Sequence, residues 1–207
     1  PLPVFVMPAE RLSLLVGFNV HRGCLAIGER RPPAAVEPWW RQAEASGLVV
    51  AAERVGNADN MGALFRNALA FGAGGILLSP GSCDPLYRKS IRVSTGAALR
   101  LPFAVDGHWP DGLGRLRDAG VRVLALTPAP PALDLDDVLS AVPAATAIAL
   151  LVGHEGDGLS DAAMRAADAR VRIALAPGVD SLNVATAAGI ALHACRRRLG
   201  WPAGARP

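Results

Sequence analysis

The stretch ALLVGHEGDGLS (residues 149–160), followed by VRIALAPGVDSLNVATAAGIALHACRRR (residues 171–198), is the part of this 207-residue chain that decides its fold. Two apolar runs, 147–152 and 171–176, are short enough to predict buried strands of an α/β sheet. Each run leads into a loop of small and polar residues, and the second loop leads into a long helix at 181–199. Ligands of open α/β sheets bind beyond the carboxyl ends of the strands. We therefore expect the two loops to form a pocket.

The chain upstream of this stretch alternates between strand and helix patterns. Strands are expected at 48–55, 74–79, 99–105 and 121–127, and helices at 60–71, 86–94, 111–119 and 135–140. A further helical turn near 39–45 ends at Gly47. Strands that alternate with helices indicate a parallel sheet covered on both faces. The predicted fold class is therefore α/β, a mostly parallel sheet flanked by helices.

The composition is that of a globular protein. Apolar residues make up 51% of the chain and the mean hydropathy is +0.29, which allows a substantial core and argues against disorder. The formal net charge is +3 and the pI is near 9.2, with arginine carrying almost all of the positive charge because Lys89 is the one lysine. This balance permits a polyanionic partner without requiring one.

Cysteine usage and hydropathy bear on the compartment. Cys24, Cys83 and Cys195 are widely spaced and form no CxxC pair, which favours a reducing compartment without disulfides or a zinc site. No apolar run approaches the ~18 residues of a membrane span, and no leader pattern is present. We expect a soluble, cytoplasmic protein with no membrane association.

The N-terminal part is expected to be a separate segment. Residues 1–31 are too few to close a core of their own, and the proline-rich stretch ERRPPAAVEP (29–38) is the best candidate for a linker. We predict two domains, residues 1–37 and 38–207. The opening PLPVFVMP also reads like a chain entered partway through.

The segment NADNMGALFRNALAFG (57–72) carries the chemistry of a helix start. The side chain of Asp59 or Asn60 can accept hydrogen bonds from the first free amides, and Gly62 leaves room for another backbone or a ligand. Arg66 lies one to two turns beyond Asn60, so both side chains can point toward the same end of the helix. A capped core helix with a solvated arginine is the alternative, which this segment by itself favours.

The segment DPLYRKSIRVSTGAALR (84–100) is basic and rich in hydroxyl groups. It places Arg88, Lys89 and Arg92 beside Ser94 and Thr95, a combination that can hold the phosphates of a nucleic acid backbone. A solvated helix face with no ligand accounts for the same residues equally well.

The last loop places Ser181 and Asn183 on either side of Leu182 at a helix start, which suits either a substrate contact or an ordinary N-cap. The usual nucleotide signatures, GxxxxGK[ST] and GxGxxG, are missing. His154 and Glu155 form half of a zinc-protease motif without its second histidine, so we expect no metal.

Taken in order, these motifs resemble one family. Asn60-x-Gly62-x-x-x-Arg66, the basic segment, the G-x-E-G-x-G-L-S loop (153–160) and S-L-N-V (181–184) are similar to the SpoU-type (TrmH-like) RNA 2′-O-ribose methyltransferases of the SPOUT superfamily. The resemblance covers residues 48–199. The phrase GFNVHRGCLAIGER (17–30) looks like the tail of the substrate-binding domain that often precedes this catalytic domain, which implies that most of an upstream RNA-binding domain lies outside this chain.

The resemblance implies S-adenosylmethionine as methyl donor, a ribose 2′-hydroxyl of ribosomal or transfer RNA as acceptor, and a trefoil knot near the C-terminus. It implies cofactor contacts at Leu151, Gly153, Ile173, Ala176, Ser181 and Leu182. It implies RNA contacts at Arg88, Lys89, Arg92, Ser94 and Thr95. The implied catalytic residues are Arg66, which activates the hydroxyl, and Asn60, Glu155, Ser181 and Asn183, which orient Arg66 and the ribose.

We expect Arg66 to stabilise the developing alkoxide as a cation, because a guanidinium is rarely deprotonated in proteins. Two positions depart from the family pattern: His154 replaces the usual Asn, and Ala185 replaces a frequent Ser. The resemblance also implies a homodimer through the knot region, with partner residues completing each site. The Ala- and Gly-rich helix at 181–199 fits that packing, although a buried intramolecular helix has the same composition.

Two other functions stay open. One is a catalytically silent, knotted RNA-binding module, against which the intact Asn60, Arg66, Glu155 and Asn183 argue. The other is a SPOUT enzyme that methylates a base nitrogen, for which Asp180 would be the nearest carboxylate base. The S-L-N phrase and Arg66 favour the ribose.

Overall fold

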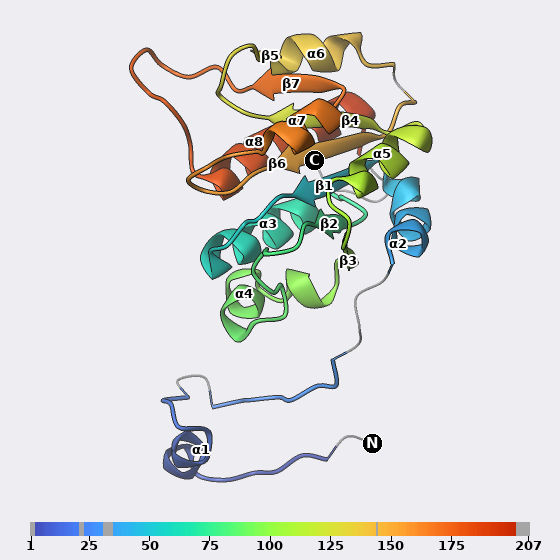
Figure 1. The fold of residues 1–207 in the computed structure, drawn as a ribbon. Helices are drawn as coiled ribbons and strands as arrows, with labels where there is room; N and C mark the ends of the chain where they lie inside the picture. The colour runs from blue at the N-terminus through green and yellow to red at the C-terminus, as the bar shows by residue number, and fades with distance from the viewer. Residues whose placement is uncertain (1–2, 21–22, 31–34, 144, 202–207) are drawn as a thin grey trace. The chain divides into compact units, whose positions relative to one another are not determined.

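The computed structural model describes residues 3–20, 23–30, 35–143 and 145–201 (Figure 1). The chain divides into two compact units, Pro1–Pro32 and Pro33–Pro207, and the division falls a few residues before the predicted domain boundary. The first unit contains the helix α1 (Ala9–Val16), which ends at Gly17 in the left-handed conformation (φ 72°). None of the residues of α1 is buried.

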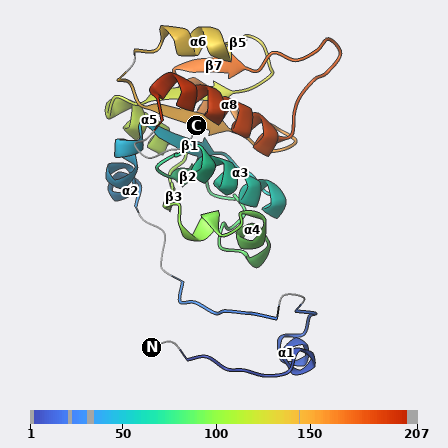
Figure 2. The same ribbon diagram turned by 180° about the vertical axis from the view of Figure 1, so that it is seen from behind.

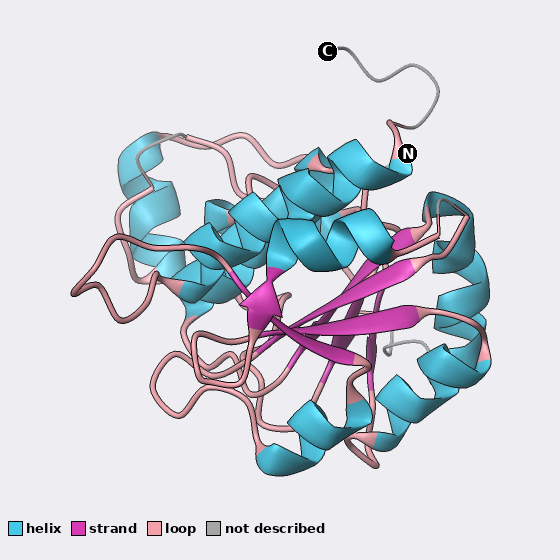
Figure 3. Ribbon diagram, turned by 90° about the horizontal axis from the view of Figure 1, so that it is seen from above, coloured by secondary structure: helices cyan, strands magenta, loops and turns pink. Residues whose placement is uncertain are grey.

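The second unit is built around one sheet. Its strands are β1 (Leu48–Ala52), β2 (Ile76–Leu78), β3 (Phe103–Val105), β4 (Arg122–Leu126), β5 (Leu133–Asp134), β6 (Ile148–Val152) and β7 (Ala169–Arg172). In the described residues the strand order is β3-β2-β1-β6-β4-β7-β5, and every pairing between these strands is parallel. Figure 3 shows the strands crossing between helices on both sides. The predicted parallel α/β fold is confirmed.

Helices cover both faces of this sheet (Figures 1 and 2). One face packs against α3 (Ala58–Ala70), α6 (Leu135–Ala141) and α8 (Val184–Leu199), and the other against α2 (Val36–Ala43), α5 (Asp111–Asp118) and α7 (Asp161–Ala166). The remaining short helices are η1 (Glu44–Ser46), α4 (Arg88–Val93) and η2 (Ala97–Leu99). Successive side chains of a strand point to opposite faces, so Leu48 and Val50 join the first core while Val49 and Ala51 join the second.

Several element ends differ from the sequence-based expectation, and three of these differences affect the candidate site. Helix α3 begins earlier than predicted, because Asn57, and neither Asp59 nor Asn60, caps it: the Asn57 side chain accepts hydrogen bonds from the amides of Asp59 and Asn60. Strand β7 ends at Arg172 rather than at residue 176, and its partner β4 has already ended at Leu126. Helix α8 begins at Val184, after its N-cap Asn183.

Two arginines near the end of α8 fasten it to the rest of the unit. The buried guanidinium of Arg196 donates hydrogen bonds to the carbonyls of Phe71 and Gly72 at the end of α3, both at 2.8 Å, and to two further carbonyls. Arg198 donates to the carbonyl of Leu139 (3.0 Å) in the last turn of α6. Cations at helix C-termini satisfy carbonyls that have no partner in their own helix. These contacts hold three helices on one face of the sheet.

The three cysteines are free: Cys24 is exposed, Cys83 is half-buried and Cys195 is buried. Burial raises the pKa of the Cys195 thiol to about 12, so this thiol is unreactive in the folded chain. Among the helices of the described ranges, none has the length and apolar content needed to cross a membrane.

Candidate functional site

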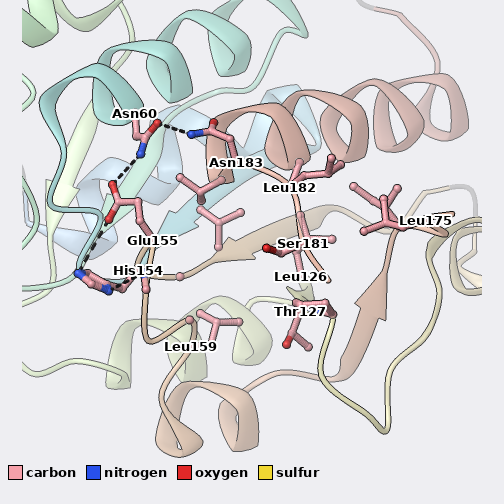
Figure 4. A pocket seen from close by; sticks show the side chains of 18 residues that line it. Asn60, Leu126, Thr127, His154, Glu155, Leu159, Leu175, Ser181, Leu182 and Asn183 are labelled. Atoms are coloured by element: carbon pink, nitrogen blue, oxygen red, sulfur yellow. Dashed lines mark hydrogen bonds and ion pairs between the residues drawn. The ribbon is translucent and has the colours of Figure 1, made fainter. Parts of the chain in front are cut away.

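A cavity of about 410 Å³ lies at the carboxyl ends of β4, β6 and β7 (Figure 4). The lining residues come from the end of β4 and the loop after it, from the end of β6 and the loop after it, from the segment after β7, from α3, and from the start of α8 and the residues just before it. They are Leu126, Thr127 and Pro128; Val152, Gly153, His154, Glu155, Gly156, Gly158 and Leu159; Ile173 and Leu175; and Asn60, Ser181, Leu182, Asn183, Val184 and Ala187. Its volume is within the range of about 300–1,000 Å³ that is typical of small-molecule sites. The predicted pocket is therefore present, with a third strand end added to its wall.

The loop after β6 is folded tightly on itself. The amide of His154 donates to the carbonyl of Gly158, and the amide of Gly158 donates to the carbonyl of His154, both at 3.1 Å. A Cβ atom on Gly153 would lie 2.5 Å from the carbonyl carbon of Gly158. Only glycine allows this close approach of two backbone segments.

Glu155 points from this loop to the start of α3. Its Oε1 accepts hydrogen bonds from the Asn57 amide (3.1 Å) and from Asn60 Nδ2 (3.0 Å), and its Oε2 accepts one from the Gly56 amide (3.2 Å). A helix N-terminus presents free N–H groups and a partial positive charge, so a carboxylate is stabilised there. Glu155 thereby joins the loop to α3.

These contacts also decide the ionisation of Glu155. Burial raises its pKa, but the hydrogen bonds from the Asn60 side chain and from backbone amides outweigh burial, and the pKa is lowered from 4.5. The carboxylate is therefore ionised at neutral pH, and it is occupied as an acceptor.

Asn60 and Asn183 extend this network to α8. Asn183 Nδ2 donates to Asn60 Oδ1 at 2.9 Å, while Asn183 Oδ1 accepts from the amides of Ala185 (3.0 Å) and Thr186 (3.2 Å). Asn183 therefore serves both as a helix N-cap and as a contact to the site. Glu155, Asn60 and Asn183 form one hydrogen-bonded chain along the cavity wall, as Figure 4 shows.

Four of the six residues predicted for the cofactor line the cavity: Gly153, Ile173, Ser181 and Leu182. The other two, Leu151 and Ala176, do not line it, and their neighbours Val152 and Leu175 do. Leu151 packs into the core on the opposite face of the sheet, because side chains alternate along a strand. Leu126, Thr127 and Pro128 were not predicted for the site. They lie at the end of the predicted strand 121–127, which could have marked them. The strand order that places this strand beside β6 depends on tertiary packing and could not be read from the sequence.

Arg66 does not line the cavity. Its side chain is exposed on α3, about 9 Å along the helix axis from Asn60 at 1.5 Å per residue. In the part of the chain that the structure describes, it makes no hydrogen bond or ion pair. Arg66 is thus an exposed cation on α3 that makes no ion pair within the described residues and lies outside the cavity of this chain.

The basic segment predicted for RNA is placed unevenly. Arg88, Arg92 and Thr95 are exposed, with Thr95 in the left-handed conformation (φ 54°). Lys89 is exposed and its Nζ pairs with Asp59 Oδ2 at 2.6 Å; this hydrogen bond and the Asp59 charge raise the pKa of Lys89. Ser94 differs from the expectation: it is buried, its hydroxyl donates to the Ile91 carbonyl and accepts from the Ala98 amide, and it serves the local fold.

A groove of about 730 Å³ runs between α3 and α8. It shares Asn60 and Asn183 with the cavity, so these two side chains separate the two hollows. The helices approach closely here: Asn67 Nδ2 donates to the Ala185 carbonyl at 2.8 Å, and a Cβ atom on Gly189 would lie 3.1 Å from Asn67 Nδ2. Ile190 is 43% exposed in this groove.

No group of three or more His, Cys, Asp or Glu side chains in the described ranges is arranged to hold a metal ion.

The model of the SpoU rRNA Methylase family matches residues 47–193, most of the unit that carries the site. The chain belongs to this family. The SpoU chain is 42% identical over 192 residues to an uncharacterized tRNA/rRNA methyltransferase of Mycobacterium tuberculosis, and the match covers 92% of this chain and 65% of that protein. The chain thus spans about two thirds of the length of such relatives.

Solved structures agree with the SpoU assignment. An AdoMet-bound rRNA methyltransferase from Sinorhizobium meliloti is 34% identical, with a TM-score of 0.66 over 73% of this chain and 56% of that chain. A structure named RNA 2′-O ribose methyltransferase is 28% identical, with a TM-score of 0.63 over 82% of this chain and 59% of that chain.

Proposed function

We propose that this chain contains the catalytic domain of an S-adenosylmethionine-dependent RNA methyltransferase that modifies a ribose 2′-hydroxyl of ribosomal or transfer RNA. The observation that carries the proposal is the cavity at the carboxyl ends of β4, β6 and β7, bordered by the hydrogen-bonded chain Glu155–Asn60–Asn183. A SpoU relative with AdoMet bound and a relative named RNA 2′-O ribose methyltransferase support it.

The residues of the cavity fit S-adenosylmethionine. Leu126, Val152, Ile173, Leu175 and Leu182 provide apolar contacts for an adenine ring. Main-chain groups of the two loops and the exposed Ser181 hydroxyl provide polar contacts. Gly153, Ile173, Ser181 and Leu182 are the proposed cofactor residues, with Val152 and Leu175 in place of Leu151 and Ala176. The knot that the family resemblance implies for these loops stays a prediction.

The cofactor, when bound, supplies a methyl group on a positively charged sulfur. The protein must then hold the ribose hydroxyl in line and stabilise the negative charge that grows on its oxygen. Glu155 is occupied by donors, so we assign it, together with Asn60 and Asn183, to holding the site in shape. We assign to Arg66 the stabilisation of the alkoxide as a cation, and to Arg88, Lys89, Arg92 and Thr95 the contacts to RNA phosphates.

Arg66 can meet the cavity of another subunit. The groove between α3 and α8 ends at Asn60 and Asn183, which also border the cavity, and its walls are small or apolar at Ala63, Gly189 and Ile190. We propose a homodimer that packs through this groove, so that Arg66 serves the cavity of the partner. We expect this enzyme to work in the cytoplasm without a metal.

Calorimetric titration with S-adenosylmethionine, and with S-adenosylhomocysteine as control, tests the first half of the proposal; we expect saturable binding near one per chain. Binding would then justify incubating the protein with ribosomal and transfer RNA and a labelled methyl donor, digesting the RNA and identifying the nucleoside by mass spectrometry. Methyl on the ribose supports the proposal. Methyl on a base nitrogen would instead show a base methyltransferase, and cofactor binding without transfer would favour a silent RNA-binding module.

A further inference from the structure

The imidazole of His154 lies within the loop that forms one wall of the cavity (Figure 4). Its Nδ1 accepts hydrogen bonds from the backbone amides of Gly156 (3.0 Å) and Asp157 (3.1 Å). A ring nitrogen can accept only when it carries no proton. The neutral ring therefore holds its proton on Nε2.

The surroundings of the ring agree with this tautomer. Nε2 lies 4.0 Å from Oε2 of Glu155, so its N–H faces a carboxylate. On the other side, Nδ1 is 3.9 Å from Oδ2 of Asp157, and that carboxylate is in turn 3.8 Å from the guanidinium of Arg54. The two acidic groups and Arg54 are the charges beside the ring.

Outside the loop, Glu155 and Asp157 contact the start of α3 and Arg54; inside it, backbone hydrogen bonds and the imidazole set its shape. Two backbone hydrogen bonds between His154 and Gly158 close it, and inside this ring of residues the amides of Gly156 and Asp157 turn toward the imidazole. Gly156 and Asp157 are exposed, so each of these hydrogen bonds replaces one to water and contributes modestly to holding the turn. The side chain of His154 thus provides, within the loop, an acceptor for the amides of Gly156 and Asp157.

We propose that His154 is a positioning residue, whose Nδ1 holds the loop 154–158 in the form that lines the cofactor cavity and presents Glu155 to the start of α3. The expected effect on cofactor binding rests on the proposed function, because it assumes that a displaced loop weakens the binding of S-adenosylmethionine in this cavity. The structural content of the proposal, the Nε2–H tautomer with Nδ1 as acceptor, is independent of that function.

Side-chain shape provides a sharp test. The Oδ1 of asparagine can occupy the place of Nδ1, whereas the Oε1 of glutamine lies near the place of Nε2. We expect His154→Asn to bind S-adenosylmethionine within about threefold of the parent protein, and His154→Gln and His154→Ala to bind about tenfold more weakly, the loss of one to two modest hydrogen bonds. The exposed His108→Asn is the matched control and should not change affinity. Equal affinity in all His154 variants, or rescue by glutamine and not by asparagine, would overturn the proposal.

The tautomer is read without any ligand. Nitrogen chemical shifts of the imidazole in the full chain should show that the neutral ring carries its proton on Nε2, with Nδ1 unprotonated. A neutral ring with its proton on Nδ1 would overturn the proposal, whatever the protein binds. If the parent protein binds no S-adenosylmethionine, the proposed function fails. The role of His154 is then still decided by the tautomer and by the amide signals of Gly156 and Asp157, which should be kept in His154→Asn and changed in His154→Gln.

Discussion

The hydrogen bonds and ion pairs of each side chain at this site indicate which role it can have. Glu155 receives three hydrogen bonds and cannot also accept a proton from substrate without giving up this network. Arg66 has no partner in the described part of the chain and lies at the surface. In the proposed function the charge that acts on the reaction is therefore that of Arg66, whereas the charge of Glu155 holds the loop against α3.

Arg66→Ala should abolish methyl transfer while leaving cofactor binding intact. Removal of one electrostatic stabiliser of a developing negative charge typically costs about 100-fold or more in turnover. The measurement is a single-turnover methylation assay beside a calorimetric titration with S-adenosylmethionine. Arg197→Ala, which removes another exposed helical arginine, is the control. Near-normal turnover of Arg66→Ala would show that our assignment of its role is mistaken.

Glu155 should make the stability of the fold depend on acidity. Its pKa in the folded chain is below 4.5, so as the pH falls the unfolded chain takes up the proton first. Its contribution to the free energy of unfolding is complete above about pH 4.5 and is lost as the pH falls through the lowered pKa of the folded state.

Urea unfolding at a series of acidic pH values measures this dependence. Glu155→Gln should flatten the curve in that window, whereas Asp161→Asn, which removes an exposed carboxyl from α7, should leave it in place. An unchanged pH dependence in Glu155→Gln would contradict the geometry described for the network.

At the scale of elements, the loop after β6 depends on one glycine more than on another. A Cβ atom at position 153 would lie 2.5 Å from backbone of the same loop, whereas at position 156 it would meet only the His154 ring at 3.5 Å. Gly153→Ala should therefore displace the loop and lose S-adenosylmethionine binding, while Gly156→Ala should keep it. Calorimetry on the two variants compares substitutions of identical size, and similar affinities would refute this account.

The end of α8 supports a second prediction. Arg196→Ala leaves buried carbonyls at the end of α3 without donors, and we expect it to lower the free energy of unfolding by about 3 kcal/mol. Arg196→Lys should recover only part of this, because an ammonium cannot reproduce the planar set of donors. Urea midpoints of these variants and of the neighbouring Arg197→Ala, which is exposed and should be near neutral, make the comparison.

Element types were more predictable from the sequence than element ends. The runs at 48–55 and 147–152 are apolar throughout most of their length, as strands buried on both faces must be, and both formed strands. The run 171–176 is just as apolar at alternate positions, yet the strand ends at Arg172, beyond the end of β4, and Ile173 and Leu175 line the cavity. The two-residue strand β5 has no pattern of its own and forms by pairing with β7.

At the scale of the whole molecule, the groove between α3 and α8 predicts the state of assembly. Ile190→Arg places a charge in this groove and should convert a dimer into monomers, as sedimentation would show, whereas Leu133→Arg on the distant strand β5 should not. A parent protein that is monomeric at all concentrations would rule out the homodimer.

A mixing experiment tests whether Arg66 works across that dimer. Arg66→Ala has an intact cavity and Gly153→Ala has an intact arginine, so each is expected to be inactive alone. If Arg66 serves the partner, mixed dimers regain one working site, which amounts to about a quarter of all sites for random exchange of equal amounts. Absence of any recovery after exchange would place Arg66 in its own subunit.

The sequence patterns by themselves did not predict that the site residues lie next to one another. The motifs at Asn60 and Asn183 were each compatible with ordinary caps, and Asn183 is in fact a cap as well as a member of the network. The family resemblance brought them together before any contact could be derived from periodicity. The residues after β4 stayed hidden because strand order depends on the packing of the whole sheet.

The wall formed by Asn60 and Asn183 belongs at once to the cavity and to the groove between α3 and α8. In the proposed homodimer, any shift of these two side chains on cofactor binding must therefore alter the surface at which the subunits meet. Thermodynamic linkage makes the effect reciprocal. If bound cofactor changes the association constant of the subunits by some factor, association changes the affinity for the cofactor by the same factor. Dilution of the protein should accordingly change its apparent dissociation constant for S-adenosylmethionine.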